Sequence, residues 1–423
     1  MERIKKLLAE AGIEEYTVIK KKERTAELFF VKKQLDTRRI KDVTKYHVTV
    51  FRIGEKDGMK LKAETALTLL DSMSDAEAVK ALKDAYYAAQ FAMNPYYEAP
   101  DPVAAPQIKK TGRLAEEAPE KAAGIMAEAL FAADGAEGAF VNSAEVFIVK
   151  KELRVITSAG TDVSWTDAKA EGEFVVQAKE PEDVEMHKQF GYDELETEAL
   201  TAKVRESLEF VRDRARAQRI LKSGNYDLLL TGENVAEVLS FYLGRSSAQL
   251  IYPHYSTWSV GEDVQGETAG ERLDITLRAS SPYSAEGIPM RDRKLIENGV
   301  MRLAHGPNRF CRYLGTEPTG NYEKFSCDNA GSAGFEEMKR TPCLWAVTFS
   351  DFQMDYFSGH FGGEIRLAYL IEDGKMTPVT GGSVNGSIID AQKDIAFSSD
   401  RFRSEEYEGP YAVLLKGISA AGE

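Results

Sequence analysis

The chain has 423 residues, a length that indicates two domains or three. Hydrophobic residues make up 43% and charged residues 29%, which is typical of a globular protein and excludes disorder as the dominant state. The net charge of −14 repels nucleic-acid phosphates, so direct nucleic-acid binding is not expected. The chain starts as a charged amphipathic helix rather than a signal peptide, and no apolar run approaches the length of a membrane span. The sequence therefore predicts a cytoplasmic protein without membrane contact.

Histidine and cysteine are scarce, and their number limits zinc or nucleophile chemistry. The histidines and cysteines are His47, His187, His254, His305, His360, Cys311, Cys327 and Cys343. No two histidines lie one helical turn apart, so the spacing of a metalloprotease helix is absent. A site that folding assembles from His254, His305 or His360 with a cysteine remains an alternative. Three cysteines do not make a disulfide framework, and we expect reduced, mostly buried thiols.

The first half of the chain predicts an N-terminal α+β domain of meandering strands and long helices, over residues 1–222. Expected strands are residues 16–22, 26–33, 46–53, 60–67, 144–150, 153–157, 161–166 and 172–179. The first helix, 4–11, is stopped by Gly12, and a capping box of Ser74 and Glu77 opens the second. A proline-rich loop, 94–119, leads to a third helix that begins at Pro119.

A fourth helix is expected from residue 198 to about 219, and its apolar spacing gives it one buried face. The residues of that face are Leu200, Val204, Leu208, Val211 and Ala215. Its end carries Arg212, Arg214, Arg216 and Arg219. We interpret these arginines as a solvated face at the negative end of the helix dipole, in preference to a nucleic-acid patch.

The second half, residues 223–423, predicts a β-rich, sheet-like or barrel-like domain. A helix is expected at 234–243, and strands at 226–230, 273–279, 294–296, 300–303, 344–349, 363–371, 376–379 and 411–416. Asn298-Gly299 and Asp373-Gly374 are type I′ hairpin signals that join neighbouring antiparallel strands. The group of Asp355, Ser358 and His360 lacks a nucleophile elbow, so we interpret it as a glycine-rich turn.

Several motifs of this half resemble the TldD/PmbA family. Residues 283–300 resemble the family's "Asp-x-Glu-Gly-x-Pro … Leu-Ile-Glu-x-Gly" signature, and residues 318–321 resemble its Thr-Gly-Asn loop. Residues 357–379 resemble its late "Phe-Ser … Gly-Tyr-Leu-Ile-Glu-x-Gly-Lys" hairpin. The resemblance implies a two-subunit cytoplasmic peptidase for unfolded peptides, whose members older names call modulators of DNA gyrase. Its TldD subunits bind zinc through His-Glu-x-x-x-His on a helix, and its TldE/PmbA subunits lack that motif.

In this chain Ser240 and Arg245 stand where the resemblance expects the two histidines, and Phe241 stands where it expects the glutamate. The resemblance therefore implies a noncatalytic TldE/PmbA-like subunit, with no catalytic residue, metal or cofactor of its own. Its expected partner is a TldD-like subunit that carries the zinc, in a heterodimer, with a homodimer possible when the chain is alone. An autonomous hydrolase with an atypical site and a homodimeric peptide-binding or scaffold protein are the alternatives.

The resemblance also suggests which residues line a substrate cleft. These residues are Glu286, Arg291, Thr319, Gly320 and Asn321. The other interpretation of the same residues is ordinary turn and hairpin structure.

Overall fold

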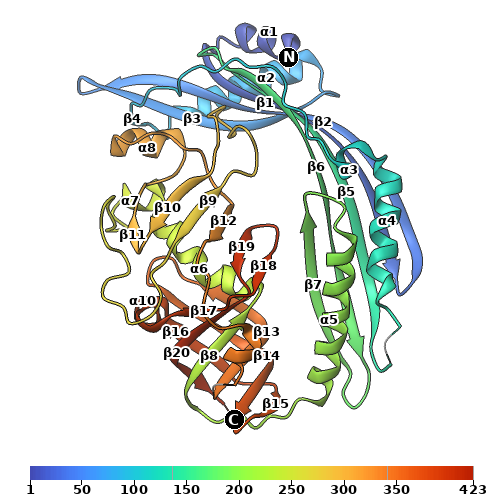
Figure 1. Ribbon diagram of the computed structural model, residues 1–423. Helices are drawn as coiled ribbons and strands as arrows, with labels where there is room; N and C mark the ends of the chain where they lie inside the picture. Colours follow the sequence, from blue (N-terminus) through green and yellow to red (C-terminus); the bar gives the residue numbers. More distant parts are fainter. Residues whose placement is uncertain (136, 341, 423) are drawn as a thin grey trace.

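A computed structural model describes residues 1–135, 137–340 and 342–422. The N-terminal half forms one long, curved sheet with helices, and the C-terminal half forms a closed barrel with a second sheet (Figure 1). In Figure 1 the long sheet bends around the C-terminal half from the end that carries α1 to the end that carries α5. This mixture of helix and strand, with a barrel in the second half, confirms the predicted α+β class. The boundary at residue 222 stays a prediction.

The N-terminal elements follow the chain as one antiparallel sheet with its helices. They are α1 (Glu2–Glu10), β1 (Glu15–Val31), β2 (Gln34–Lys56), β3 (Met59–Leu70), α2 (Asp75–Ala89), β4 (Asn94–Pro95), α3 (Arg113–Glu116), α4 (Pro119–Ala132), β5 (Phe140–Thr157), β6 (Asp162–Ala178), β7 (Val184–Tyr192) and α5 (Thr197–Arg216). The strand order is β4-β3-β2-β1-β5-β6-β7, so β4 and β7 are the edges.

The four longer helices cover one face of this sheet, because alternate residues of a strand point to the same side. On β1, Val18 joins the core under α1 and α2, whereas Ala26 and Leu28 join the core under α4 and α5. All three positions are even-numbered, so both helix pairs pack on the same face. The C-terminal half meets the opposite face, where Trp165 lies 5.9 Å from Tyr283 between ring centroids.

The long strands correct the sequence prediction. Residues 16–22 and 26–33 were expected as separate strands but form β1 together, and the four expected strands between 144 and 179 are only two, β5 and β6. Polar residues interrupt the apolar pattern at these points, yet the ladder continues through them. Lys22 pairs with Glu152 across the strands, with 3.2 Å between Nζ and Oε1. The residues of β2 before Tyr46 lack an apolar alternation because nearly all of them are exposed, and β7 was not expected at all.

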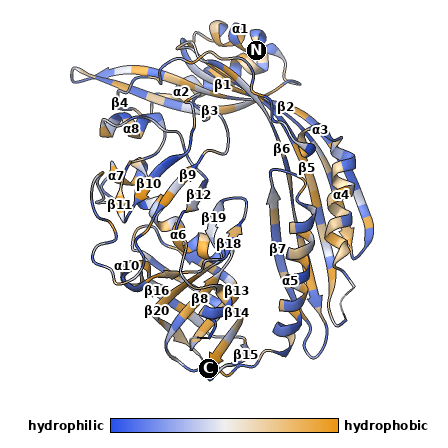
Figure 2. Ribbon diagram, viewed as in Figure 1, coloured by the Kyte–Doolittle hydropathy of each residue, from blue (hydrophilic) through white to orange (hydrophobic). Residues whose placement is uncertain are grey.

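The helices agree closely with the prediction. Ser74 Oγ accepts a hydrogen bond from the Glu77 backbone N–H at 3.3 Å. The Glu77 side chain accepts one from the Ser74 backbone N–H, which completes the capping box. Pro119 lies in the first turn of α4, and all five residues predicted for the buried face of α5 are buried. Figure 2 shows α4 mostly in hydrophobic colours, whereas α5 alternates between hydrophobic and hydrophilic colours.

The C-terminal elements build a barrel and a six-stranded sheet. They are β8 (Gly224–Thr231), α6 (Glu233–Arg245), α7 (Ala248–Ile251), β9 (Ile275–Arg278), β10 (Arg293–Glu297), β11 (Val300–Met301), α8 (Asn308–Leu314), β12 (Lys324–Cys327), α9 (Phe335–Met338), β13 (Cys343–Met354), β14 (His360–Glu372), β15 (Lys375–Val379), β16 (Ser383–Ser387), α10 (Ile388–Ala391), η1 (Gln392–Asp394), β17 (Ala396–Phe397), β18 (Arg401–Arg403), β19 (Tyr407–Pro410) and β20 (Ala412–Ala421). Strands β13-β8-β20-β16-β14 close on themselves because β13 also pairs with β14.

Both predicted hairpins of this half are present. Asn298 and Gly299 have φ of 50° and 75°, and Asp373 and Gly374 have φ of 49° and 73°. Two consecutive positive φ angles are the requirement of a type I′ turn, which explains these residue types. No helix in the described ranges is long and apolar enough to cross a membrane.

We expect α5 to dock the two halves through Phe210, whose ring lies 6.0 Å from that of Trp345 on the barrel. Phe210→Ala should lower the free energy of unfolding by about 1–3 kcal/mol, because a half-buried aromatic contact is lost. Urea unfolding measures this. Phe91→Ala is the matched control, since Phe91 is 74% exposed and should change stability by less than about 0.5 kcal/mol. Equal effects of the two substitutions would contradict the docking role.

Candidate functional site

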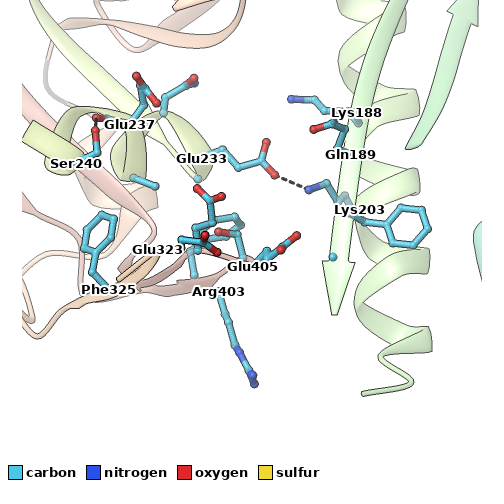
Figure 3. Close-up of a pocket in the computed structure, with 18 of the residues that line it drawn as sticks. Lys188, Gln189, Lys203, Glu233, Glu237, Ser240, Glu323, Phe325, Arg403 and Glu405 are labelled. Carbon is cyan, nitrogen blue, oxygen red and sulfur yellow. Dashed lines mark hydrogen bonds and ion pairs between the residues drawn. The ribbon is translucent and has the colours of Figure 1, made fainter. Parts of the chain in front are cut away.

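A cavity of about 1310 Å³ lies between the two halves of the chain. Strands β5, β6 and β7 and helix α5 form its N-terminal wall. Helix α6, the segment 321–325 and the loop between β18 and β19 form the C-terminal wall (Figure 3). The cavity therefore exists only because of the way in which the two halves are held together.

Three lysine–carboxylate pairs connect the halves at or beside this cavity. They are Lys203–Glu233 at 2.6 Å, Lys324–Asp193 at 2.8 Å, and Lys169–Glu405. The carboxylates are 38% to 50% exposed, so each pair contributes at most about 1 kcal/mol. The pairs fix the register of the two walls more than they stabilise the fold.

The C-terminal wall is rich in carboxylates. In Figure 3, Glu237, Glu323 and Glu405 lie on this side, across from Lys188 and Lys203. Burial raises the pKa of the neighbouring Glu406, and the charges of Glu405 and Glu323 raise it further. Burial also raises the pKa of Glu237, although its Oε1 accepts a hydrogen bond from the Met354 backbone N–H at 3.0 Å.

The N-terminal wall carries the cations. Burial lowers the pKa of Lys188, and the nearby Lys203 lowers it further, against the opposing effect of Glu233. Burial alone would raise the pKa of Glu233, but Lys203 and Lys188 outweigh it, so the pKa lies below its usual value. Glu233 is thus a cavity carboxylate whose charge is compensated by the cations of the N-terminal wall.

Strand β7 presents its outer edge to the cavity. Residues 188–192 line the cavity, and β7 is the last strand of its sheet. Within the described residues no strand pairs with this outer edge, so backbone N–H and C=O groups there are available to an extended ligand.

Helix α6 places the residues predicted for the lost zinc motif in three environments. Ser240 lines the cavity, where its Oγ donates to the Glu237 carbonyl at 2.5 Å. Phe241 is 1% exposed and packs 5.6 Å from the ring of Trp258. Arg245 donates from Nη1 to the Tyr255 carbonyl at 2.8 Å and lies over Trp258.

Of the residues predicted for a substrate cleft, only Asn321 lines the cavity. Thr319 is buried behind it and accepts a hydrogen bond from the Gly306 N–H at 2.9 Å. Gly320 has φ of 77°, and a side chain there would collide with Ser284.

Glu286 and Arg291 lie elsewhere. Glu286 Oε2 accepts a hydrogen bond from the Asn308 N–H, the first residue of α8, at 2.9 Å. Exposed Arg291 lies 3.8 Å from a carboxylate oxygen of Glu317. A role in substrate binding stays a prediction for all five residues.

His305 is a cavity residue that the sequence marked only as one of the scattered histidines. It is 6% exposed, and its Nε2 donates to the Leu243 carbonyl of α6 at 2.9 Å. Its Nδ1 has no hydrogen-bond partner. Burial lowers the pKa of His305, so the ring is neutral and Nδ1 is a free acceptor. No local sequence pattern around residue 305 indicates that it lines a cavity, since its neighbours in the cavity come from distant segments.

The other histidine and cysteine candidates do not converge. Asp355 accepts hydrogen bonds from Ser358 Oγ and the Phe357 N–H, and the His360 N–H donates to Ser358 Oγ, which forms the predicted turn. Across residues 1–135, 137–340 and 342–422, no three His, Cys, Asp or Glu residues are grouped so that they could hold a metal ion. The three cysteines are unpaired and buried, as predicted.

Comparison with known families assigns the C-terminal half. The family described as the PmbA/TldA metallopeptidase C-terminal domain matches residues 223–422. This match places residues 223–422 in the C-terminal domain of the TldD/PmbA family. This agrees with the family that the sequence motifs indicated.

Two curated relatives of this family are named Metalloprotease TldD homolog. The protein of Buchnera aphidicola (subspecies Acyrthosiphon pisum) is 29% identical over 168 residues, which cover 36% of this chain and 35% of that protein. The protein of Haemophilus influenzae is 28% identical over 163 residues, which cover 34% of each. The chain thus matches about a third of the length of these relatives.

Solved structures extend the likeness to the whole fold. TldE from Thermococcus kodakarensis has a TM-score of 0.77 at 16% identity and covers 99% of this chain and 100% of its own. A Thermotoga maritima protein described as a modulator of a DNA gyrase has a TM-score of 0.78 at 17% identity and covers 99% of both chains. At these identities the likeness concerns the fold alone.

The zinc of TldD-type subunits does not fit the residues of α6. The side chains at the predicted motif are a hydroxyl, a buried phenyl ring and a guanidinium, and a guanidinium has no lone pair to give to a metal.

The carboxyl of Glu286 offers a test of its structural role. Burial raises its pKa above that of the unfolded chain, so the ionised form costs stability at neutral pH and the cost disappears as pH falls below the unfolded value. Glu286→Gln keeps an acceptor for the Asn308 N–H and should raise the thermal midpoint at pH 7 by roughly 1–3 °C. Thermal melts should then converge below pH 4 or so. Exposed Glu55→Gln is the control, and a Glu286→Gln protein that is less stable at pH 7 would refute this account.

Proposed function

We propose that this chain is a noncatalytic, TldE/PmbA-like subunit of a cytoplasmic zinc metallopeptidase complex that acts on unfolded peptides. A TldD-like partner would supply the zinc and the general base, and this chain would contribute a peptide-binding wall. The observation that carries the proposal is the chemistry of α6. Helix α6, whose Ser240 lines the large interdomain cavity, carries Ser240, buried Phe241 and Arg245 at the positions where the family resemblance expects the zinc ligands and the base.

The edge of β7 supports the peptide-binding part of the proposal. An extended peptide that pairs with a sheet edge is held by main-chain hydrogen bonds, which do not depend on its sequence. Residues 188–192 of β7 line the cavity and leave their outer backbone groups unpaired within the described residues. Binding of this kind suits unfolded substrates, because a folded protein has few free strands to offer.

Affinity purification of the tagged full-length chain from its own cells tests the proposal. We expect a co-purifying protein that bears His-Glu-x-x-x-His, with stoichiometric zinc and peptide hydrolysis in the complex. Removal of zinc with a chelator should abolish hydrolysis, whereas the isolated chain should show neither stoichiometric zinc nor activity.

The two alternatives give different results in the same experiment. Zinc and hydrolysis in the isolated chain would identify an autonomous hydrolase. A homodimer that recovers no such partner and binds peptides without cleavage would identify a scaffold protein. Either result would refute the division of labour between two subunits.

A further inference from the structure

The charges that line the interdomain cavity are strongly unbalanced. Among the described residues, eight glutamates line it against Lys188, Lys203 and Arg403, although Lys169, which is not in the lining, is paired with Glu171 and Glu405. Two of these bases are on the N-terminal wall, where Lys203 is already paired with Glu233. A low-dielectric cleft of one sign concentrates ligands of the opposite charge. The cavity as a whole therefore favours a cation.

The excess of negative charge is concentrated on the C-terminal wall. Within the described residues, no cation forms an ion pair with Glu237, Glu323 or Glu406, whereas Glu405 is paired with Lys169. These carboxylates are close enough to influence one another, because Glu405, Glu323 and Glu237 each raise the pKa of Glu406. Lys169 lowers the pKa of Glu406, but burial and the like charges outweigh it, so a further cation bound at this wall would be stabilised.

An independent feature of the same cavity offers the backbone contacts of an extended ligand. Residues 188–192 of β7 line the cavity, and within the described residues no strand pairs with the outer edge of β7. Its backbone N–H and C=O groups are therefore open to a peptide strand. His305 Nδ1 also lacks a hydrogen-bond partner, but protein atoms enclose it, so it is no contact for a ligand.

We infer that the cavity selects extended peptide segments that carry lysine or arginine, whose side chains bind between Glu237, Glu323 and Glu406 while their backbone pairs with the outer edge of β7. This inference rests on the proposed peptide-binding function and adds the substrate class. The edge of β7 would hold the backbone, and the acidic wall opposite would choose the side chains. A carboxylate-rich peptide is rejected by the same wall.

Binding of three matched fluorescent peptides to the full-length chain tests the inference. The peptides share one unstructured sequence, and several alternate positions are all Lys, all Gln or all Glu. Fluorescence anisotropy at low and high salt gives their affinities. We expect the lysine peptide to bind at least about tenfold more tightly than the glutamine peptide at low salt, with the difference shrinking as salt screens the charges.

A triple variant, Glu237→Gln with Glu323→Gln and Glu406→Gln, should remove most of this preference. The control is Glu55→Gln with Glu182→Gln and Glu372→Gln, which changes the net charge equally at exposed positions outside the cavity. The control should shift the affinity by less than about twofold, because distant surface charges are screened. Thermal melts of both variants verify that they fold.

Three outcomes overturn the inference. Equal affinity for the lysine and glutamine peptides would show that the wall does not select cations, while peptide binding itself would stand. An equal loss in the cavity variant and the control would assign the preference to the overall charge of the chain. If none of the peptides binds, the proposed peptide-binding function fails together with the inference.

Discussion

Helix α5 is packed on two sides, and the interdomain cavity depends on that double packing. One side buries Leu200 and Val204 in the core beneath the long sheet. The other side reaches the barrel through Phe210, beside Trp345, and through Asp213, which accepts a hydrogen bond from a barrel tyrosine at 2.5 Å. A helix anchored in both halves holds β7 and α6 at a set distance. The two walls of the cavity are thereby held apart.

This packing explains how the cavity wall tolerates its charges. Partly exposed ion pairs such as Lys203–Glu233 contribute little, so apolar contacts along α5 must stabilise the arrangement of the halves. The arrangement of the two halves therefore does not depend on ion pairs formed by Glu237 or Glu406. Their burial and mutual repulsion cost stability, and proteins retain such costs mainly where a ligand removes them.

The sequence predicted features that local physics decides and missed those that tertiary structure decides. The cap at Ser74, the buried face of α5 and the Asn298-Gly299 hairpin follow from short-range hydrogen bonding, periodicity and backbone preference. The continuity of β1 could not be predicted, because charged residues at its centre are paired across strands that lie far away in the sequence. The cavity was missed for the same reason, since only the fold brings Lys188 and Glu406, which are far apart in the sequence, to the same cavity.

The packing of α6 indicates that a zinc centre there would require more than new ligands. Phe241 is enclosed by aromatic rings, with Trp258 at 5.6 Å and Tyr242 at 5.4 Å, so a glutamate in its place would be desolvated without a partner, at a cost of several kcal/mol. Arg245 donates a hydrogen bond to the Tyr255 carbonyl, and a histidine in its place would have to supply that hydrogen bond. The local core is thus built around the side chains that are present. This packing supports the proposed division of labour, in which another protein would carry out the hydrolysis.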